Sequence, residues 1–326
     1  MIWYFPLEYV DNRYTQDMDI TIQKELKKQK KKYQVIGKPE TQTIQNKHDF
    51  LNSTQTSRRK LEQIKIVTEL FEQNKIMDGD TFFFADIWHC GIEAIPYMAY
   101  FNRKTVSLCG ILHAGSFTPS DFVANMKPWA KNYEKAIIQM CNKIFLGSNQ
   151  PKADLISQGY IEQYGNLFVT GIPIDTKLMH KKAKPKQWKD KKDIVLFTGR
   201  LADEKQPFLF DDLATKYPEY QFIKTQDLNL NKTEYYELLS KSKACISFAL
   251  QENYGIAAIE CAAYGVNLLL PNRLSYKDLY PQKFLYNNEQ ELHTKLKQLM
   301  SKDNTEELQQ IAKKHDDNAA KIVELL

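Results

Sequence analysis

The sequence lacks paired cysteines, long apolar runs and a large charge excess, and each absence excludes a class of protein. Its five cysteines are scattered without a C-x-x-C pair, which argues against a zinc cluster or a disulfide framework. No apolar run approaches the ~20 residues that span a bilayer, and the N-terminus lacks the basic start of a signal peptide. The formal charge of +5 permits an acidic or phosphorylated partner without demanding one. We therefore expect a soluble, cytoplasmic protein.

What the sequence does contain is enough apolar material for two domains, since 43% of its 326 residues are hydrophobic. In the first half, short apolar runs alternate with segments of helical periodicity, at 91–101 and 121–142. This alternation predicts βαβ units and a parallel sheet. The predicted strands are 81–85, 105–112, 143–146 and 166–169.

The second half repeats the alternation after a segment, 180–192, in which seven residues are lysine. We interpret this segment as an interdomain connector. The predicted organisation is an N-terminal acceptor domain, a lysine-rich linker, a donor domain and a last helix that packs back on the first domain. The corresponding ranges are 1–178, 179–192, 193–304 and 305–326. The predicted strands of the donor domain are 193–198, 220–224, 244–249 and 266–270, and its predicted helices are 207–217, 233–240 and 256–264.

Two cations follow the predicted strand 193–198. Gly199 allows close approach of a ligand to the backbone, and Arg200 and Lys205 lie just before a predicted helix N-terminus. Fixed positive charge beside free N–H groups suits a diphosphate. Surface charges on a loop would explain the same residues.

Two glutamates, Glu252 and Glu260, bracket the next glycine-containing loop and helix. The first carboxylate lies on the loop with the N–H groups of Asn253, Tyr254 and Gly255, and these groups can bind sugar hydroxyls. The second lies within the helix and can bind a ribose diol through both of its oxygens. A helix-surface glutamate is the alternative for Glu260.

Together these segments resemble the family-4-like retaining glycosyltransferases of GT-B fold. That resemblance implies an α/β protein with two Rossmann-like domains facing across an inter-domain cleft. It also implies that Arg200 and Lys205 hold the donor diphosphate, that Glu252 and the following amides hold the transferred sugar, and that Glu260 holds the ribose. The matching segments are 199–205, 252–256 and 259–265, with further landmarks at 144–148 and 168–175.

The first half matches that family less fully. His113 resembles the family's cleft histidine, and Asp86 is a candidate to orient or deprotonate an acceptor hydroxyl, with helix capping as its alternative. Glu93, Arg13 and Tyr14 are the candidate acceptor-binding residues. The family usually has a glycine-rich loop after its first strand, whereas residues 5–15 contain no glycine, which suggests a specialised acceptor site.

Residues 4–15, 82–93 and 110–122 also resemble glycosyltransferases encoded by tailed bacteriophages. This resemblance implies a hydroxymethylated pyrimidine base in phage DNA as the acceptor, modified in the host cytoplasm. Two lysine runs, at 24–32 and 180–192, are candidate phosphate contacts or solvated surfaces. Trp88 and Tyr14 are candidates to support a base drawn out of its stack.

We expect no required metal or resident cofactor, only a nucleotide-sugar co-substrate, with UDP-sugar favoured. Asp17 and Asp19 form a D-x-D pattern in a helical stretch of the first domain, far from the predicted diphosphate site, and we interpret it as a surface feature. Arg200 and Lys205 can supply the neutralising charge that a metal would otherwise bring. The predicted activity is retaining sugar transfer. The alternatives are transfer to a surface glycan, glycolipid or small molecule, a nucleotide-sugar epimerase, and a non-catalytic module that binds a nucleotide sugar or DNA.

Overall fold

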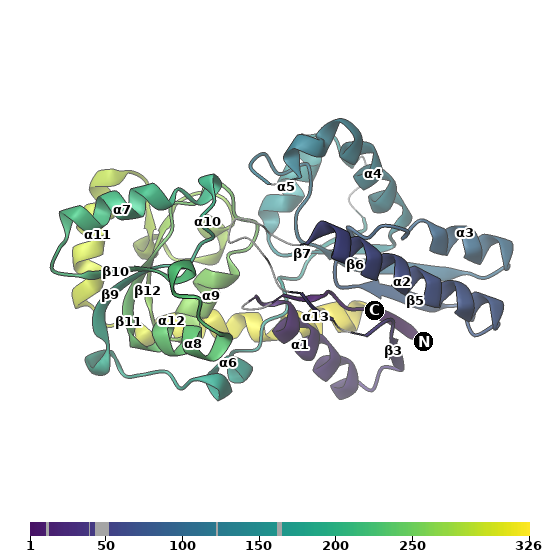
Figure 1. Cartoon of the computed structure of the whole chain (residues 1–326), viewed down its shortest axis with the longest axis horizontal. Helices are drawn as coiled ribbons and strands as arrows, with labels where there is room; N and C mark the ends of the chain where they lie inside the picture. Colours follow the sequence, from purple (N-terminus) through teal and green to yellow (C-terminus); the bar gives the residue numbers. More distant parts are fainter. Residues whose placement is uncertain (11–12, 39, 43–51, 122, 162–164) are drawn as a thin grey trace. The chain divides into compact units, whose positions relative to one another are not determined.

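The computed structural model describes residues 1–10, 13–38, 40–42, 52–121, 123–161 and 165–326. The chain divides into two compact units (Figure 1). The first unit comprises the described residues up to Ile174 together with the chain's last segment, Asp317–Leu326. The second unit is built from Asp175–Asp316. Residues 11 and 12 of the glycine-free segment, and residue 122 of a predicted helix, lie outside the described residues.

The first unit is built on a six-stranded parallel sheet with the order β3-β1-β5-β6-β7-β8. The order reverses between β1 and β5, which is where open α/β sheets place their ligand crevice. A short parallel pair, β2 (Tyr9–Val10) and β4 (Thr41–Gln42), lies apart from this sheet. The six strands are β1 (Ile2–Phe5), β3 (Tyr33–Val35), β5 (Asp80–Phe84), β6 (Val106–Leu112), β7 (Lys143–Leu146) and β8 (Leu167–Val169).

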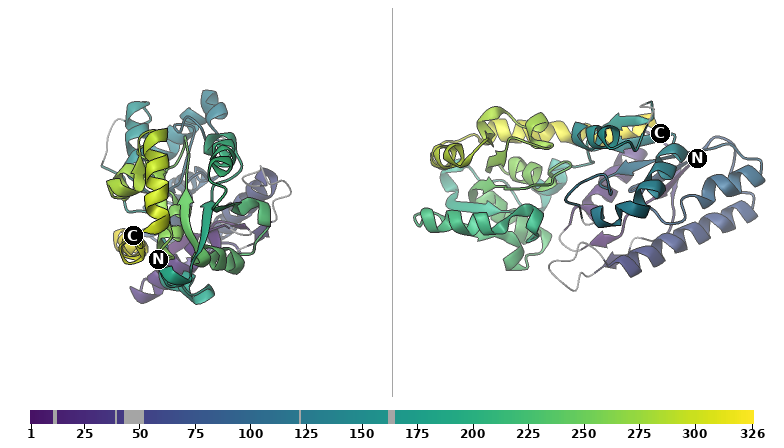
Figure 2. Two further views of the ribbon diagram at one scale, coloured as in Figure 1. Left: turned by 90° about the vertical axis from the view of Figure 1, so that its left-hand side faces the viewer. Right: turned by 90° about the horizontal axis from the view of Figure 1, so that it is seen from above.

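Helices connect these strands, and the last one comes from the far end of the chain. In Figures 1 and 2 the yellow helix α13 runs beside the purple helix α1, and Gln29 at the end of α1 donates to the carbonyl of Ala320 at 3.3 Å. Docking of α13 therefore makes the chain's end part of this unit. The helices are α1 (Thr15–Lys28), α2 (Ser53–Glu72), α3 (Ala94–Phe101), α4 (Lys127–Met140), α5 (Asn149–Ser157) and α13 (Asn318–Leu325), with a 3-10 turn at Ala124–Met126.

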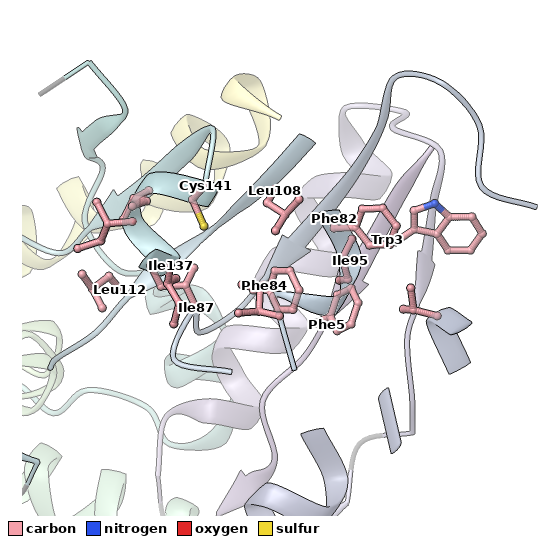
Figure 3. Packing of buried hydrophobic residues seen from close by; sticks show 14 of the residues in the cluster. Trp3, Phe5, Phe82, Phe84, Ile87, Ile95, Leu108, Leu112, Ile137 and Cys141 are labelled. Atoms are coloured by element: carbon pink, nitrogen blue, oxygen red, sulfur yellow. The ribbon is translucent and has the colours of Figure 1, made fainter. Parts of the chain in front are cut away.

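Strand β5 illustrates why this unit folds as a covered parallel sheet. All five of its residues are buried, and Phe82 and Phe84 pack with Phe5 on one face while Phe83 stacks on Tyr4. Figure 3 shows Phe5, Phe82 and Phe84 within the same apolar cluster as Leu108 and Ile137. A strand that is apolar on both faces is typical of a sheet covered on both sides.

The second unit has a five-stranded parallel sheet with the order β10-β9-β11-β12-β13. Its order reverses between β9 and β11, so this sheet also has a switch point. The predicted α/β class is confirmed in both units. The strands are β9 (Lys192–Phe197), β10 (Gln221–Lys224), β11 (Ser242–Ile246), β12 (Asn267–Pro271) and β13 (Leu285–Tyr286). The helices are α6 (Thr176–Lys182), α7 (Pro207–Lys216), α8 (Lys232–Lys241), α9 (Ile256–Ala263), α10 (Tyr276–Leu279), α11 (Glu289–Ser301) and α12 (Thr305–Lys313). Five 3-10 turns complete the second half: Trp188–Asp190, Asp203–Lys205, Thr225–Leu228, Gln282–Phe284 and Lys314–Asp317.

The lysine-rich segment 180–192 belongs to the second unit and is not uniformly exposed. It contains the end of α6, a 3-10 turn and the start of β9. Lys191 is buried and donates to the carbonyls of Ser242 at 3.0 Å and Tyr264 at 2.8 Å. Burial lowers the pKa of Lys191 to about 8. This lysine therefore joins two elements of the unit.

The prediction that the D-x-D pattern of α1 is a surface feature is wrong for its second aspartate, Asp19. The Asp19 side chain is buried, with 1% of the residue exposed, and it accepts from Tyr9 Oη and from Gln23 Nε2 at 3.0 Å. These donors make burial of the carboxylate tolerable. Over the described residues, no group of three or more His, Cys, Asp or Glu side chains is placed to ligate a metal ion.

No helix in the described part of the chain combines the length and the apolar character that a bilayer crossing requires.

Candidate active site

The loop after β9 carries two cations that are already paired with carboxylates. Arg200 Nη2 lies 2.7 Å from Glu204 Oε1. Lys205 ends a 3-10 turn, and its Nζ lies 3.3 Å from Glu252 Oε2 and donates to the carbonyl of Gln251. The cations predicted for a diphosphate are thus held at the carboxyl end of the sheet by neighbouring acids.

The loop after β11 is organised around Glu252. Its Oε1 accepts from the N–H of Gly255 at 2.9 Å, and its Oε2 accepts from Tyr276 Oη at 3.4 Å. Gly255 has φ +83°, and a Cβ there would lie 2.8 Å from the Tyr276 ring. Glycine is required at this position for both reasons, and it brings Glu252 to the N-terminus of α9.

A pocket lies where β9, β11 and β12 end, at the sheet's switch point. Gly199, Lys205 and Glu252 all line it, so the structure brings these three predicted residues together. The remaining lining residues are Phe197, Thr198, Cys245, Ile246, Ser247, Ala257, Ala258, Leu270 and Tyr276.

The side chains of Asn253 and Tyr254 bind within the second unit and do not line this pocket. Gln251 Nε2 donates to Asn253 Oδ1 at 2.7 Å, and the buried Tyr254 Oη lies 2.5 Å from His315 Nδ1. The contacts predicted for these two residues with a sugar are through their backbone N–H groups.

Glu260 lies inside α9 and is buried, with 4% of the residue exposed. Its Oε1 lies 2.6 Å from Lys232 Nζ and 3.1 Å from Tyr236 Oη, and its Oε2 lies 3.2 Å from Tyr235 Oη. The carboxylate therefore has a lysine and two tyrosines of α8 around it. The sequence analysis missed these three partners, although a lysine and paired tyrosines close together at a helix start were visible as a signal.

In the first unit, His113 follows β6 and is brought together with Tyr14. His113 Nε2 lies 2.8 Å from the carbonyl of Ala85, and Nδ1 lies 3.2 Å from Tyr14 Oη. A carbonyl only accepts, so Nε2 donates to it, and when the ring carries this one proton Nδ1 accepts from the tyrosine hydroxyl. The neighbouring Arg13 donates its backbone N–H to the carbonyl of Val10 at 3.1 Å.

Asp86 follows β5 and holds the turn after it. Its Oδ1 accepts from the N–H of Trp88 at 3.1 Å, and its Oδ2 lies 3.8 Å from Lys60 Nζ. Lys60 reaches this edge from α2, which the sequence analysis did not consider. Glu93 is exposed at the start of α3 and makes no side-chain capping bond there.

The comparisons with known proteins agree with this architecture. No family model matches the chain. A tRNA-queuosine alpha-mannosyltransferase from Drosophila melanogaster is 37% identical over 68 residues, which is 21% of this chain and 18% of that protein. The chain thus matches less than a fifth of this curated relative.

Solved structures match over more of the chain. The lipopolysaccharide outer core galactosyltransferase WaaB has a TM-score of 0.60 at 14% identity and covers 100% of this chain and 99% of its own. Sucrose-phosphate synthase from Thermosynechococcus elongatus has a TM-score of 0.61 at 12% identity, over 99% of this chain and 94% of its own. TarM of S. aureus, solved with UDP, has a TM-score of 0.53 at 16% identity, over 79% of this chain and 56% of its own. The predicted fold class is confirmed: the chain has the GT-B fold, with two parallel sheets of Rossmann-like type.

Proposed function

We propose that this chain is a nucleotide-sugar-dependent glycosyltransferase that retains the configuration of the transferred sugar. The observation that carries the proposal is the 3.3 Å pairing of Lys205 with Glu252 in the pocket at the β9/β11 switch point. A bound diphosphate requires cations at this edge of the sheet. The hydroxyl groups of a bound sugar require an oriented hydrogen-bond acceptor. The pocket has both, and two of the proteins described above are named as a mannosyltransferase and a galactosyltransferase.

In the proposed reaction, the bond between the anomeric carbon and the β-phosphate oxygen breaks, and its electron pair leaves with the nucleoside diphosphate. Arg200 and Lys205 exchange their carboxylate partners for phosphate oxygens and stabilise the developing charge. Gly199 permits the close approach of the diphosphate. The acceptor hydroxyl forms the new bond on the face that the diphosphate leaves, and its proton passes to Asp86 or to the departing diphosphate oxygen.

Glu252, with the backbone N–H groups of Asn253, Tyr254 and Gly255, holds the transferred sugar in this proposal, and Glu260 holds the donor's ribose. We propose UDP-sugar as the donor and the cytoplasm as the site of reaction. The charges supplied by the chain take the place that a metal fills in other enzymes, so a metal is not part of the proposed mechanism.

On the acceptor side, we propose that His113 and Asp86 face the reacting groups and that Arg13, Tyr14 and Glu93 bind the acceptor. His113 contacts the sugar as a polar group. Asp86 orients or deprotonates the acceptor hydroxyl through Oδ2, which lies 3.8 Å from Lys60 Nζ.

The proposed acceptor is a hydroxymethylated pyrimidine in phage DNA. The short match to a tRNA-queuosine mannosyltransferase favours a second candidate, a modified tRNA nucleoside, because that relative's name describes sugar transfer to a nucleic acid. The test is incubation with a panel of nucleotide sugars and with hydroxymethylated DNA, tRNA, or no acceptor, followed by mass spectrometry of the nucleosides.

A hexose added to a nucleoside supports the proposal, and the acceptor that gains mass identifies the substrate class. Conversion of one nucleotide sugar to another without acceptor would instead establish an epimerase. Binding of the nucleotide sugar without any turnover would establish a non-catalytic module.

A further inference from the structure

The hydrogen bonds around Glu260 leave its two carboxylate oxygens unequal. Each carboxylate oxygen has two lone pairs. Oε1 already accepts from Lys232 at 2.6 Å and from Tyr236 at 3.1 Å, whereas Oε2 accepts from Tyr235 at 3.2 Å. In this arrangement Oε1 is saturated and Oε2 keeps one lone pair.

We infer that Lys232 competes with the donor's ribose for Glu260 and thereby sets how strongly the site distinguishes a ribonucleotide from a deoxyribonucleotide. The inference rests on the proposed function, in which Glu260 binds the ribose. A diol bound to both oxygens of one carboxylate needs a lone pair from each. Binding of the diol therefore requires one of the two donors to leave Oε1.

Lys232 is the donor that leaves. Tyr236 is fully buried, and its ring stacks on Tyr264 with the centroids 5.4 Å apart, so its hydroxyl has no room to withdraw. The Lys232 side chain is 16% exposed and flexible, and it extends from the first residue of α8. A cation at a helix N-terminus is disfavoured by the helix dipole.

What retains the ammonium in the absence of nucleotide is a local cage. Lys232 Nζ lies 5.0 Å from the centroid of the Tyr235 ring and 4.9 Å from that of Tyr236, within the range of a cation–π contact. With the carboxylate, these rings supply three favourable contacts to one cation. The ribose must therefore displace a well-held competitor.

The consequence is a difference between two nucleotides that differ by one hydroxyl. A 2′-deoxyribose offers a single hydroxyl, which Oε2 accepts while Lys232 stays in place. A ribose gains its second bond only when Lys232 leaves Oε1, so the second bond contributes little to affinity. Lys232 thus lowers the preference for a ribonucleotide.

The experiment is calorimetric titration of the full chain with UDP and with 2′-deoxy-UDP, comparing the ratio of the two dissociation constants. We expect a ratio within about threefold in the wild type, and about tenfold higher in Lys232→Met, since one hydrogen bond to a charged group is worth roughly that factor. Lys232→Arg keeps a cation at the site and keeps the wild-type ratio. Tyr235→Phe removes a donor from Oε2 and leaves Oε1 saturated, so its ratio also stays unchanged.

Two results would overturn the inference. A Lys232→Met protein that binds UDP with the wild-type ratio, and whose melting temperature shows it folded, overturns the role of Lys232 and leaves the proposed function standing. A wild-type protein that binds neither nucleotide overturns the inference together with the proposed function. Adding Glu260→Gln to Lys232→Met separates these cases further, because the double variant loses the roughly tenfold discrimination only if the carboxylate contacts the ribose.

Discussion

Lys205 Nζ and Glu252 Oε2 lie 3.3 Å apart although the residues are 47 positions apart in the sequence. Each follows a strand, and those strands, β9 and β11, are neighbours at the point where the sheet order reverses. The carboxyl ends of parallel strands meet at one edge, so two distant loops form one site. The pairing holds the ammonium in place before any ligand enters.

Replacement of Lys205 by Gln should weaken binding of UDP by about tenfold or more, because a charge-assisted contact to a phosphate is lost. Calorimetric titration measures the effect. Lys216→Gln is the matched control, since Lys216 pairs with Glu289 at 2.7 Å on an exposed surface of the same unit. Equal UDP affinity in the two variants would remove Lys205 from the diphosphate site.

Replacement of Glu252 by Gln should reduce the turnover of a nucleotide sugar by about a hundredfold or more, with a smaller effect on UDP affinity. The carboxylate is proposed to hold the transferred sugar, which UDP lacks, so the loss should appear in turnover. The Glu237→Gln variant is the control, because Glu237 forms an exposed pair with Lys241. A parallel loss of UDP affinity and turnover would indicate that Glu252 organises the whole loop.

His113 should carry a proton on Nε2. The Ala85 carbonyl at 2.8 Å from Nε2 only accepts, and the Tyr14 hydroxyl lies 3.2 Å from Nδ1. Nitrogen-15 NMR of the ring distinguishes the two tautomers directly. A spectrum of the Nδ1–H tautomer at neutral pH would contradict this assignment, and in Tyr14→Phe the Nδ1 resonance should shift while Nε2 stays protonated.

Replacement of Gly171 by Ala should destabilise the first unit by more than the same change at Gly79. Both glycines have a left-handed backbone, with φ +79° and +81°, so both variants lose about 1–2 kcal/mol from backbone strain. A Cβ at Gly171 would lie 2.2 Å from Asn318 Nδ2, whereas nothing lies within 4 Å at Gly79. Asn318 belongs to α13 and donates to the carbonyl of Ile172 at 3.0 Å, so the collision also disturbs docking of this helix.

Urea unfolding measures the two free energies, and limited proteolysis of the C-terminus reports on α13. We expect Gly171→Ala to lose about 1–3 kcal/mol more than Gly79→Ala and to be cleaved faster. Equal stabilities would show that α13 tolerates displacement at no cost.

His89 should make the first unit sensitive to acid. Burial, reinforced by the charges of Lys60 and Arg59, lowers the pKa of His89 from 6.5 to about 3. Below pH 6.5 His89 binds a proton in the unfolded chain, whereas in the folded chain it stays neutral until the pH approaches 3. Stability from the neutral histidine is therefore fully present above pH 6.5 and is lost as the pH falls from there toward 3.

Between pH 7 and pH 4 the wild type should lose up to about 3 kcal/mol more free energy of unfolding than His89→Gln, at about 1.4 kcal/mol per pH unit below 6.5. Urea unfolding at both pH values measures this difference within each protein. The same pH dependence in both proteins would show that His89 takes up its proton as readily in the folded chain as in the unfolded chain.

The local pattern predicts much of the second unit because each strand there is a short apolar run with a polar loop after it. The strand predicted at 193–198 is observed at Lys192–Phe197, and the helix predicted at 256–264 at Ile256–Ala263. Gly265, which follows that helix, has φ +65°, the left-handed conformation in which glycine often ends a helix. Periodicity and glycine chemistry act over a few residues, so a single sequence contains this information.

The partners of buried charged side chains lie far from them in the sequence, so local patterns did not predict these contacts. Lys232, Tyr235 and Tyr236 lie 24 to 28 positions before Glu260 and meet it only through tertiary contacts between α8 and α9. Asp19 was expected at the surface, and its donor Tyr9, which lies 10 positions away and outside the helix, could not be identified from the helix pattern. A carboxylate is buried only where donors reach it, and tertiary structure decides which donors do.

The central claim is that the β9/β11 pocket binds a nucleotide sugar and releases its diphosphate. The most direct measurement is release of nucleoside diphosphate from a panel of nucleotide sugars by the wild type and by Lys205→Gln, with and without hydroxymethylated DNA or tRNA. The account predicts release from at least one UDP-sugar by the wild type, stimulated by an acceptor, and at least tenfold slower release by the variant. Absence of release from every donor with every acceptor, or equal rates in the two proteins, would contradict it.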